Sequence, residues 1–178
     1  MTTDSVTTAI EQWLDAMVVG LNLCPFAKAA RRRGLVRIAV ASGTTQLHCL
    51  QELADEAAQL QLADDEATTL FVLPQGFDDF DQYLDLLAIS EALLADLGLE
   101  GVLQLASFHP LYQFDGTEID DVSNWTNRAP CPILHLLKEE GLSVAIDAHP
   151  DPEGIPARNI LKLEELGLAG VRNLLVTH

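Results

Sequence analysis

The chain has 178 residues, of which 48% are hydrophobic, and its formal net charge is −17. This length suits one packed core and is short for two, so we expect a single globular domain over residues 1–178. The negative charge repels phosphate backbones and excludes nucleic acid as an expected partner. The N-terminus has no basic stretch leading into an apolar one, and no apolar run is long enough to cross a membrane. We therefore expect a cytoplasmic protein without a membrane partner.

The first predicted element is a helix over residues 8–21. Apolar residues recur there at helical spacing after a capping box formed by Thr8 and Glu11. The basic run KAARRRGLVR follows, and we interpret its arginines as closing a second helix that stops at Gly34, because the C-terminus of a helix favours cations. The alternative interpretation is that this run docks an acidic partner or an anionic surface.

The rest of the chain alternates between predicted strands and helices. Strands are predicted at residues 35–41, 68–73, 101–107 and 142–148. Four helices lie between and after these strands. The first is capped by Thr44 or Thr45, and the second carries Asp78, Asp79 and Asp81 in its first turn and ends at Gly98. The third is a short helix at residues 132–140 that stops at Gly141, and the fourth covers residues 157–166. This order predicts an α/β fold, a single layered domain with a mainly parallel sheet of about four strands flanked by helices. The alternative is a ferredoxin-like α+β sandwich.

Three predicted strands run into a proline, at Leu73-Pro74, His109-Pro110 and His149-Pro150. If these strands are parallel, both His-Pro pairs lie at the edge where open α/β sheets bind ligands. The alternative for each histidine is a residue at a strand exit that bonds to the backbone.

Cys24 is the candidate nucleophile. In GLNLCPFAK it precedes a proline suited to the first position of a helix, and a helix N-terminus stabilises a thiolate. Cys131 has the same arrangement before Pro132. The alternative is that each cysteine is a small buried apolar residue. Three cysteines at wide spacings argue against a disulfide framework.

The segment between residues 104 and 137 holds the other candidate site residues. Asp121, Asn124, Asn127 and Arg128 supply an acid or base, amides and a planar cation, and this set suits a small anionic or carbonyl-bearing ligand. The alternative is an ordered loop in which Asp and Asn form turns and Arg128 pairs with an acidic neighbour. His135 lies in the first turn of the next predicted helix, where the dipole favours its neutral form; it faces the same pocket or sits at the edge of the core.

The segments GLNLCPFAK, QLASFHPLYQF, NRAPCPILHLL and IPARNILKLEELG together resemble the bacterial domain-of-unknown-function 1415 family over most of the chain. The resemblance implies a small cytosolic protein without an established activity, substrate or cofactor, so the cofactor is unknown. Cys131 departs from the family pattern, which has an aromatic residue there. Arg158 and Asn159 match the later segment and suggest a second anion contact. The residues in the signature segments are Cys24, His109, Asp121, Asn124, Asn127, Arg128 and His135.

Our leading hypothesis is a small-molecule enzyme with Cys24 as nucleophile and His109 as its proton partner, with Asp121 as a further acid or base. Its substrate-binding residues are Asn124, Asn127, Arg128, His135 and Arg158. The alternative is a non-catalytic protein that binds a metabolite or a protein partner. A third hypothesis, a metal site from His109, His149 and Asp121, has no supporting ligand spacing. The sequence predicts no particular substrate and no oligomeric state.

Overall fold

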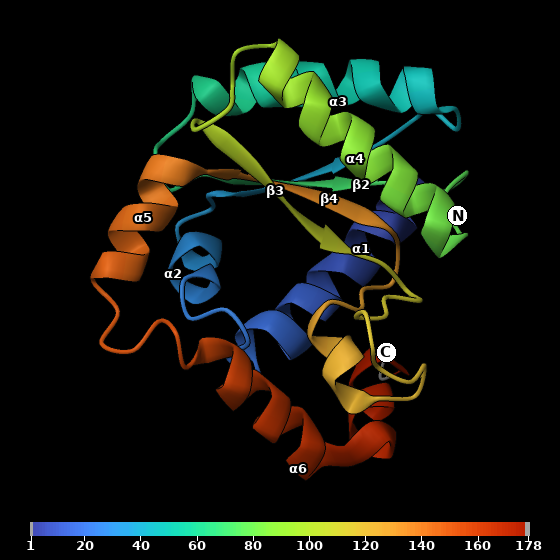
Figure 1. Cartoon of the computed structure of the whole chain (residues 1–178), viewed down its shortest axis with the longest axis vertical. Helices are drawn as coiled ribbons and strands as arrows, with labels where there is room; N and C mark the ends of the chain where they lie inside the picture. Colours follow the sequence, from blue (N-terminus) through green and yellow to red (C-terminus); the bar gives the residue numbers. More distant parts are fainter. Residues whose placement is uncertain (1, 177–178) are drawn as a thin grey trace.

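A computed structural model describes residues 2–176 of the chain (Figure 1). None of the helices in this part is long and apolar enough to cross a membrane. The helices are α1 (Thr3–Trp13), the π-helix η1 (Leu14–Val19), α2 (Ala27–Arg32), α3 (Gln46–Gln61), α4 (Phe80–Asp96), the 3-10 helix η2 (Val122–Thr126), α5 (Glu139–Asp147) and α6 (Ile155–Val176). The strands are β1 (Val36–Val40), β2 (Thr68–Val72), β3 (Leu103–Phe108) and β4 (Ile133–Lys138).

The four strands form one open sheet in the order β1-β2-β4-β3. β1 and β2 are parallel, whereas β4 is antiparallel to both of its neighbours, β2 and β3. β1, β2 and β3 therefore run in one direction, and β4 lies between two of them in the opposite direction. β1 and β3 are the edges of the sheet.

Helices cover the two faces of the sheet unequally. α3 and α4 pack on one face, which we call the α3 face; α1 packs on the other, the α1 face, with η2 and α6 beyond it (Figure 1). On the α3 face the core contains Phe71 and Leu134 with Tyr83 of α4. On the α1 face it contains Leu70 and Ile133 together with the side chains of α1. Strand side chains alternate between these two cores, as the pleat requires.

Helix caps explain several of the observed boundaries. Thr45 accepts a hydrogen bond from the backbone of α3, and Asp79 caps α4 by accepting one from Gln82 N at 3.0 Å. Gly34 has a φ of 70°, which suits the residue after α2. The first helix differs from the expectation, because it begins earlier, with Thr2 as its cap, and continues beyond α1 into η1.

The sequence prediction is wrong for two adjacent elements. Residues 132–140, expected to be a helix, contain strand β4, and residues 142–148, expected to be a strand, lie in helix α5 and its end. The apolar run of β4 is buried on both faces of the sheet, with Ile133, Leu134 and Leu136 each 0% exposed. A short apolar run of this kind does not distinguish a central strand from a buried helix by periodicity. Gly141, taken as a helix stop, lies against the backbone of Asp65 instead.

The α/β architecture with a four-stranded sheet flanked by helices is confirmed, but the sheet is mixed and not mainly parallel. The two His-Pro pairs consequently do not share an edge. His109 follows β3, whereas His149 follows α5, which continues from the end of the antiparallel β4. The ligand set of the metal hypothesis is therefore not assembled, and within residues 2–176 no three His, Cys, Asp or Glu side chains are close enough to hold one ion.

The cap of α4 is a direct test of this fold. We expect Asp79→Ala to lower the free energy of unfolding by about 1 kcal/mol, because the N–H of Gln82 loses its acceptor. Asp85→Ala, in the middle of the same helix and exposed, is the matched control with little effect. Urea denaturation of both variants measures the difference. Equal stability of the two would mean that Asp79 does not act as a cap.

Candidate functional site

His109, the proposed proton partner of Cys24, is fully buried at the end of β3. Its Nδ1 accepts a hydrogen bond from Leu111 N at 3.0 Å, so the proton resides on Nε2, which donates to Phe77 O at 3.0 Å. The ring lies 5.1 Å from the rings of both Phe80 and Tyr83. Burial lowers the pKa of His109, although Phe77 O partly opposes this. Both ring nitrogens are thus occupied by the backbone, as in the strand-exit interpretation.

Arg128 and Asn124, expected to clamp an anion, hold the long loop together. Arg128 is 8% exposed and donates from Nε to Tyr112 O at 3.1 Å and from Nη2 to Ile119 O at 2.7 Å. Its guanidinium also lies 5.1 Å from the ring centre of Trp125. Asn124 is fully buried, and its amide donates to Glu118 O while its carbonyl accepts from the backbone and a threonine of the loop. These groups satisfy backbone atoms that would otherwise be buried without partners.

The remaining residues of the expected clamp also have structural partners. Asn127 donates to Ser107 O at 3.0 Å. Asp121 caps η2 by accepting from Ser123 N at 2.9 Å, and its hydrogen bonds with Ser123 lower its pKa. Arg158 forms an ion pair with Asp151 at the start of α6 and does not join Arg128. The structure therefore does not bring the expected substrate-binding residues together.

Cys24 lies in the connection between η1 and α2. This connection is anchored to α6, because Asn159 donates to Leu23 O and Lys162 donates to Leu21 O, both at 2.7 Å. Asn22 adopts a left-handed conformation, with a φ of 54°. Burial raises the pKa of the Cys24 thiol, while hydrogen bonds from the backbone of Phe26 and Ala27 lower it in part.

Cys24 and His109 lie on opposite sides of the sheet. Leu23, next to Cys24, belongs to the core of the α1 face, whereas Phe77 and Tyr83, which surround His109, belong to the core of the α3 face. Catalytic partners must come within hydrogen-bond reach of each other. The structure therefore does not bring Cys24 and His109 together as partners, and Asp121 is engaged at the cap of η2.

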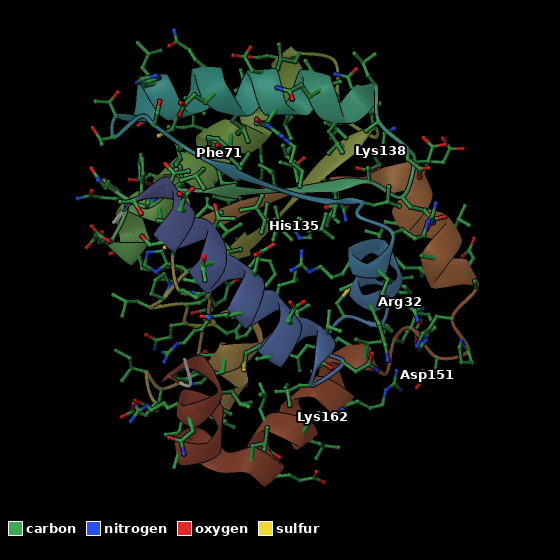
Figure 2. The ribbon with its side chains drawn as sticks, turned by 180° about the vertical axis from the view of Figure 1, so that it is seen from behind. Arg32, Phe71, His135, Lys138, Asp151 and Lys162 are labelled. Carbon is green, nitrogen blue, oxygen red and sulfur yellow. The ribbon has the colours of Figure 1, made fainter. Side chains whose placement is uncertain are left out.

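His135 differs from the other candidates because one ring nitrogen is open. It lies in the middle of β4 on the α1 face, on the side of the sheet toward α1 and α2 (Figure 2). Thr68 Oγ1 donates its only proton to Leu136 O at 2.7 Å, so it accepts the hydrogen bond from His135 Nε2. His135 is thus the Nε2–H tautomer, and its Nδ1 carries a lone pair.

Nδ1 of His135 has no hydrogen-bond partner in the described part of the chain. It is also not among the fully buried polar atoms of that part. Within residues 2–176, Trp125 Nε1 is the one fully buried side-chain polar atom without a partner, so His135 Nδ1 keeps at least a small contact with solvent. The ring as a whole is half-buried, and burial lowers its pKa to about 4. His135 is consequently neutral at pH 7, with a fixed acceptor directed out of the sheet.

The strand register identifies the neighbours of this acceptor. Ala106 on β3 is paired with His135, and Gln104 is paired with Leu137, so Gln104 is the diagonal neighbour of His135 on the same face. The ring centre of Phe108 lies 6.1 Å from that of His135. Gln104 has no hydrogen bond to its side chain among residues 2–176. We call this half-buried set the His135 face: Gln104, Ala106, Phe108, His135 and Leu137.

Sequence reasoning missed Gln104 and placed His135 on a helix. The available signal is the alternation of strand residues, since Gln104, Ala106 and Phe108 are two apart on β3 and His135 and Leu137 are two apart on β4. The alternation predicts that Gln104 and His135 are neighbours only when β4 is recognised as a strand. Chemically, the His135 face combines a nitrogen acceptor, an amide and an aromatic ring, without a charged group.

Titration of His135 gives a test of this environment. Its pKa is about 4 in the folded protein, against an unperturbed value of 6.5, so the unfolded chain binds a proton first as the pH falls. The free energy of unfolding should therefore decrease between pH 6.5 and pH 4, with a contribution from His135 of at most about 3 kcal/mol. We expect a shallower decrease in His135→Gln than in the wild type, measured by chemical denaturation. If the free energy of unfolding falls equally steeply with pH in the wild type and in His135→Gln, burial does not lower the pKa of His135.

No curated protein and no solved structure matches the chain. One protein family matches residues 5–173, and its description is "Protein of unknown function (DUF1415)". The match covers most of the chain, including the four segments on which the resemblance was based, and confirms it. The chain thus belongs to the DUF1415 family of proteins of unknown function.

Proposed function

We propose that the protein binds a small uncharged molecule, without covalent chemistry, at the His135 face. The observation that carries this proposal is the open Nδ1 of His135, held in position by the hydrogen bond between Nε2 and Thr68. A fixed acceptor on a half-buried surface favours a ligand that donates an O–H or N–H to it. At pH 7 this acceptor is uncharged, because the pKa of His135 is about 4.

The neighbouring side chains support a ligand with a flat apolar part and a polar edge. The Phe108 ring offers a surface for stacking, and the Gln104 amide offers both a donor and an acceptor. Diagonal neighbours on a strand pair lie about 7–8 Å apart, so one small ring can contact Gln104 and His135 together. This combination is typical of ligand sites, which are largely apolar with a few polar groups that fix orientation.

An uncharged ligand replaces the anionic one expected from the sequence. Arg128 already donates from Nε and Nη2 to loop carbonyls, and Arg158 is paired with Asp151. The net charge of −17 also raises the electrostatic cost of bringing an anion to the protein.

The experiment is a screen by two-dimensional NMR with uncharged aromatic fragments that carry a hydroxyl or amide group, each paired with its O- or N-methylated analogue. We expect shifts of the Ala106 and Leu137 amides with the donor fragments and about tenfold weaker binding of the methylated analogues, the cost of one lost hydrogen bond. Gln104→Leu and His135→Gln should weaken binding, whereas His48→Gln should not. A screen in which no fragment shifts these amides, or in which methylation has no effect, would refute the proposal.

A second candidate, an enzyme that uses Cys24, is favoured by two observations. Backbone hydrogen bonds of Phe26 and Ala27 lower the pKa of the Cys24 thiol in part and so favour its anion. η1 ends at Val19 and the left-handed Asn22 follows it, both shortly before Cys24, and π-helical turns are frequent at functional sites.

Alkylation of Cys24 decides between the two candidates. Because burial outweighs the backbone hydrogen bonds and raises the pKa of Cys24, we expect it to react with iodoacetamide at pH 7 more slowly than free cysteine. Mass spectrometry assigns the modified residue, with Cys24→Ser as the control against reaction at the buried Cys49 and Cys131. Reaction faster than free cysteine would favour the enzyme.

A further inference from the structure

We propose that the open edge of β1, with the groove between β1 and α3, takes an extended basic segment of another protein. The sheet order leaves β1 with one neighbour, β2. Leu35 O and Ala41 N both bond to the β2 side, and backbone groups alternate in direction along a strand. The N–H and C=O groups of Val36, Ile38 and Val40 therefore point away from the sheet.

This edge lacks the devices that normally block strand addition. Proteins protect edges with prolines, bulges, covering segments or outward charges. β1 contains neither proline nor glycine, and it pairs with β2 in an unbroken register over its whole length. Its one charge, on Arg37, is held against α3 by two hydrogen bonds to Glu56, at 2.7 and 2.9 Å. The outward N–H and C=O groups of Val36, Ile38 and Val40 are thus presented for pairing.

A groove runs between β1 and α3 beside this edge. Its α3 wall carries Glu52, Asp55, Glu56 and Gln59, and its β1 wall carries residues 37–40. Glu56 is neutralised by Arg37. Glu52 accepts hydrogen bonds from Ser42 and Gly43, and one of its oxygens lies 3.9 Å from Nε2 of His48. Asp55 is exposed, and no ion pair or hydrogen bond to its side chain occurs among residues 2–176. Asp55 is therefore without a cation, and the cation next to Glu52 is a histidine that is charged only when it is protonated.

The charge determines which strand fits. A strand added to β1 directs alternate side chains toward α3, since its pleat continues that of the sheet. Lysine or arginine at those alternate positions reaches Glu52 and Asp55, and the net charge of −17 attracts a basic segment at long range. A second copy of this chain would instead bring its own acidic α3 next to the first, and like charges disfavour that arrangement.

The test uses nine-residue peptides with blocked ends, added to the full chain in a two-dimensional NMR titration. The first alternates Lys and Thr, the second alternates Glu and Thr, and the third is the Lys-Thr peptide with every backbone nitrogen methylated, so that neither edge can donate a hydrogen bond. We expect only the first to shift the amides of Val36, Ile38 and Val40, more weakly as salt is added. Asp55→Asn should weaken this binding by about threefold, and the matched control Asp85→Asn on α4 should not.

Each remaining outcome would overturn the proposal. Equal binding of the methylated peptide would mean that the charge of the protein, and not strand pairing, attracts the peptide. Equal binding of the Glu-Thr peptide would mean that the carboxylates of the groove do not select basic side chains. Shifts of the β1 amides with rising protein concentration alone would assign the edge to a second copy. The absence of any shift at millimolar peptide would mean that the edge takes no such segment.

Discussion

The fold depends on one constraint, which is the burial of β4 between β2 and β3. This strand runs against both neighbours and closes the gap that a parallel crossover from β2 through α4 to β3 leaves in the sheet. Its side chains enter both cores, and Leu134 and Ile133 lie on opposite faces. Tyr83 connects the layers at the end of β4, because its hydroxyl donates to Ile133 O and accepts from Phe108 N. Removing β4 would separate the sheet into a parallel pair and an isolated edge strand.

The position of β4 also decides which polar residues are open to a ligand. The long loop before it is rich in groups that bind substrates in other proteins, but the loop has little secondary structure, and its backbone needs partners. Arg128 and Asn124 supply these partners, so the same donor groups are not free to bind a ligand. His135 lies in a regular strand whose backbone is already paired, so only one of its nitrogens is engaged, by Thr68. A polar side chain on a strand is freer to bind a ligand than one that holds a loop.

The two proposed surfaces use different parts of the same sheet. The His135 face belongs to β3 and β4 on the α1 side, and its side chains are half-buried. The groove beside β1 belongs to the opposite edge and the α3 side. A small ligand and an extended segment would therefore not compete for the same residues. The sheet is common to both, and β2 is the strand that separates them.

The sequence by itself determined the α/β class, three of the strands, a threonine cap at the start of α3, the acidic start of α4 and the family, because these follow from local periodicity, capping chemistry and motifs. The tertiary structure decided that residues 133–138 form a strand and not a helix, since an apolar run of this length suits either until its neighbours are known. It also decided that Cys24 and His109 are apart and that Gln104 and His135 are together. Distance along the chain carries no information on these pairs, which are set by the face of the sheet that each residue occupies.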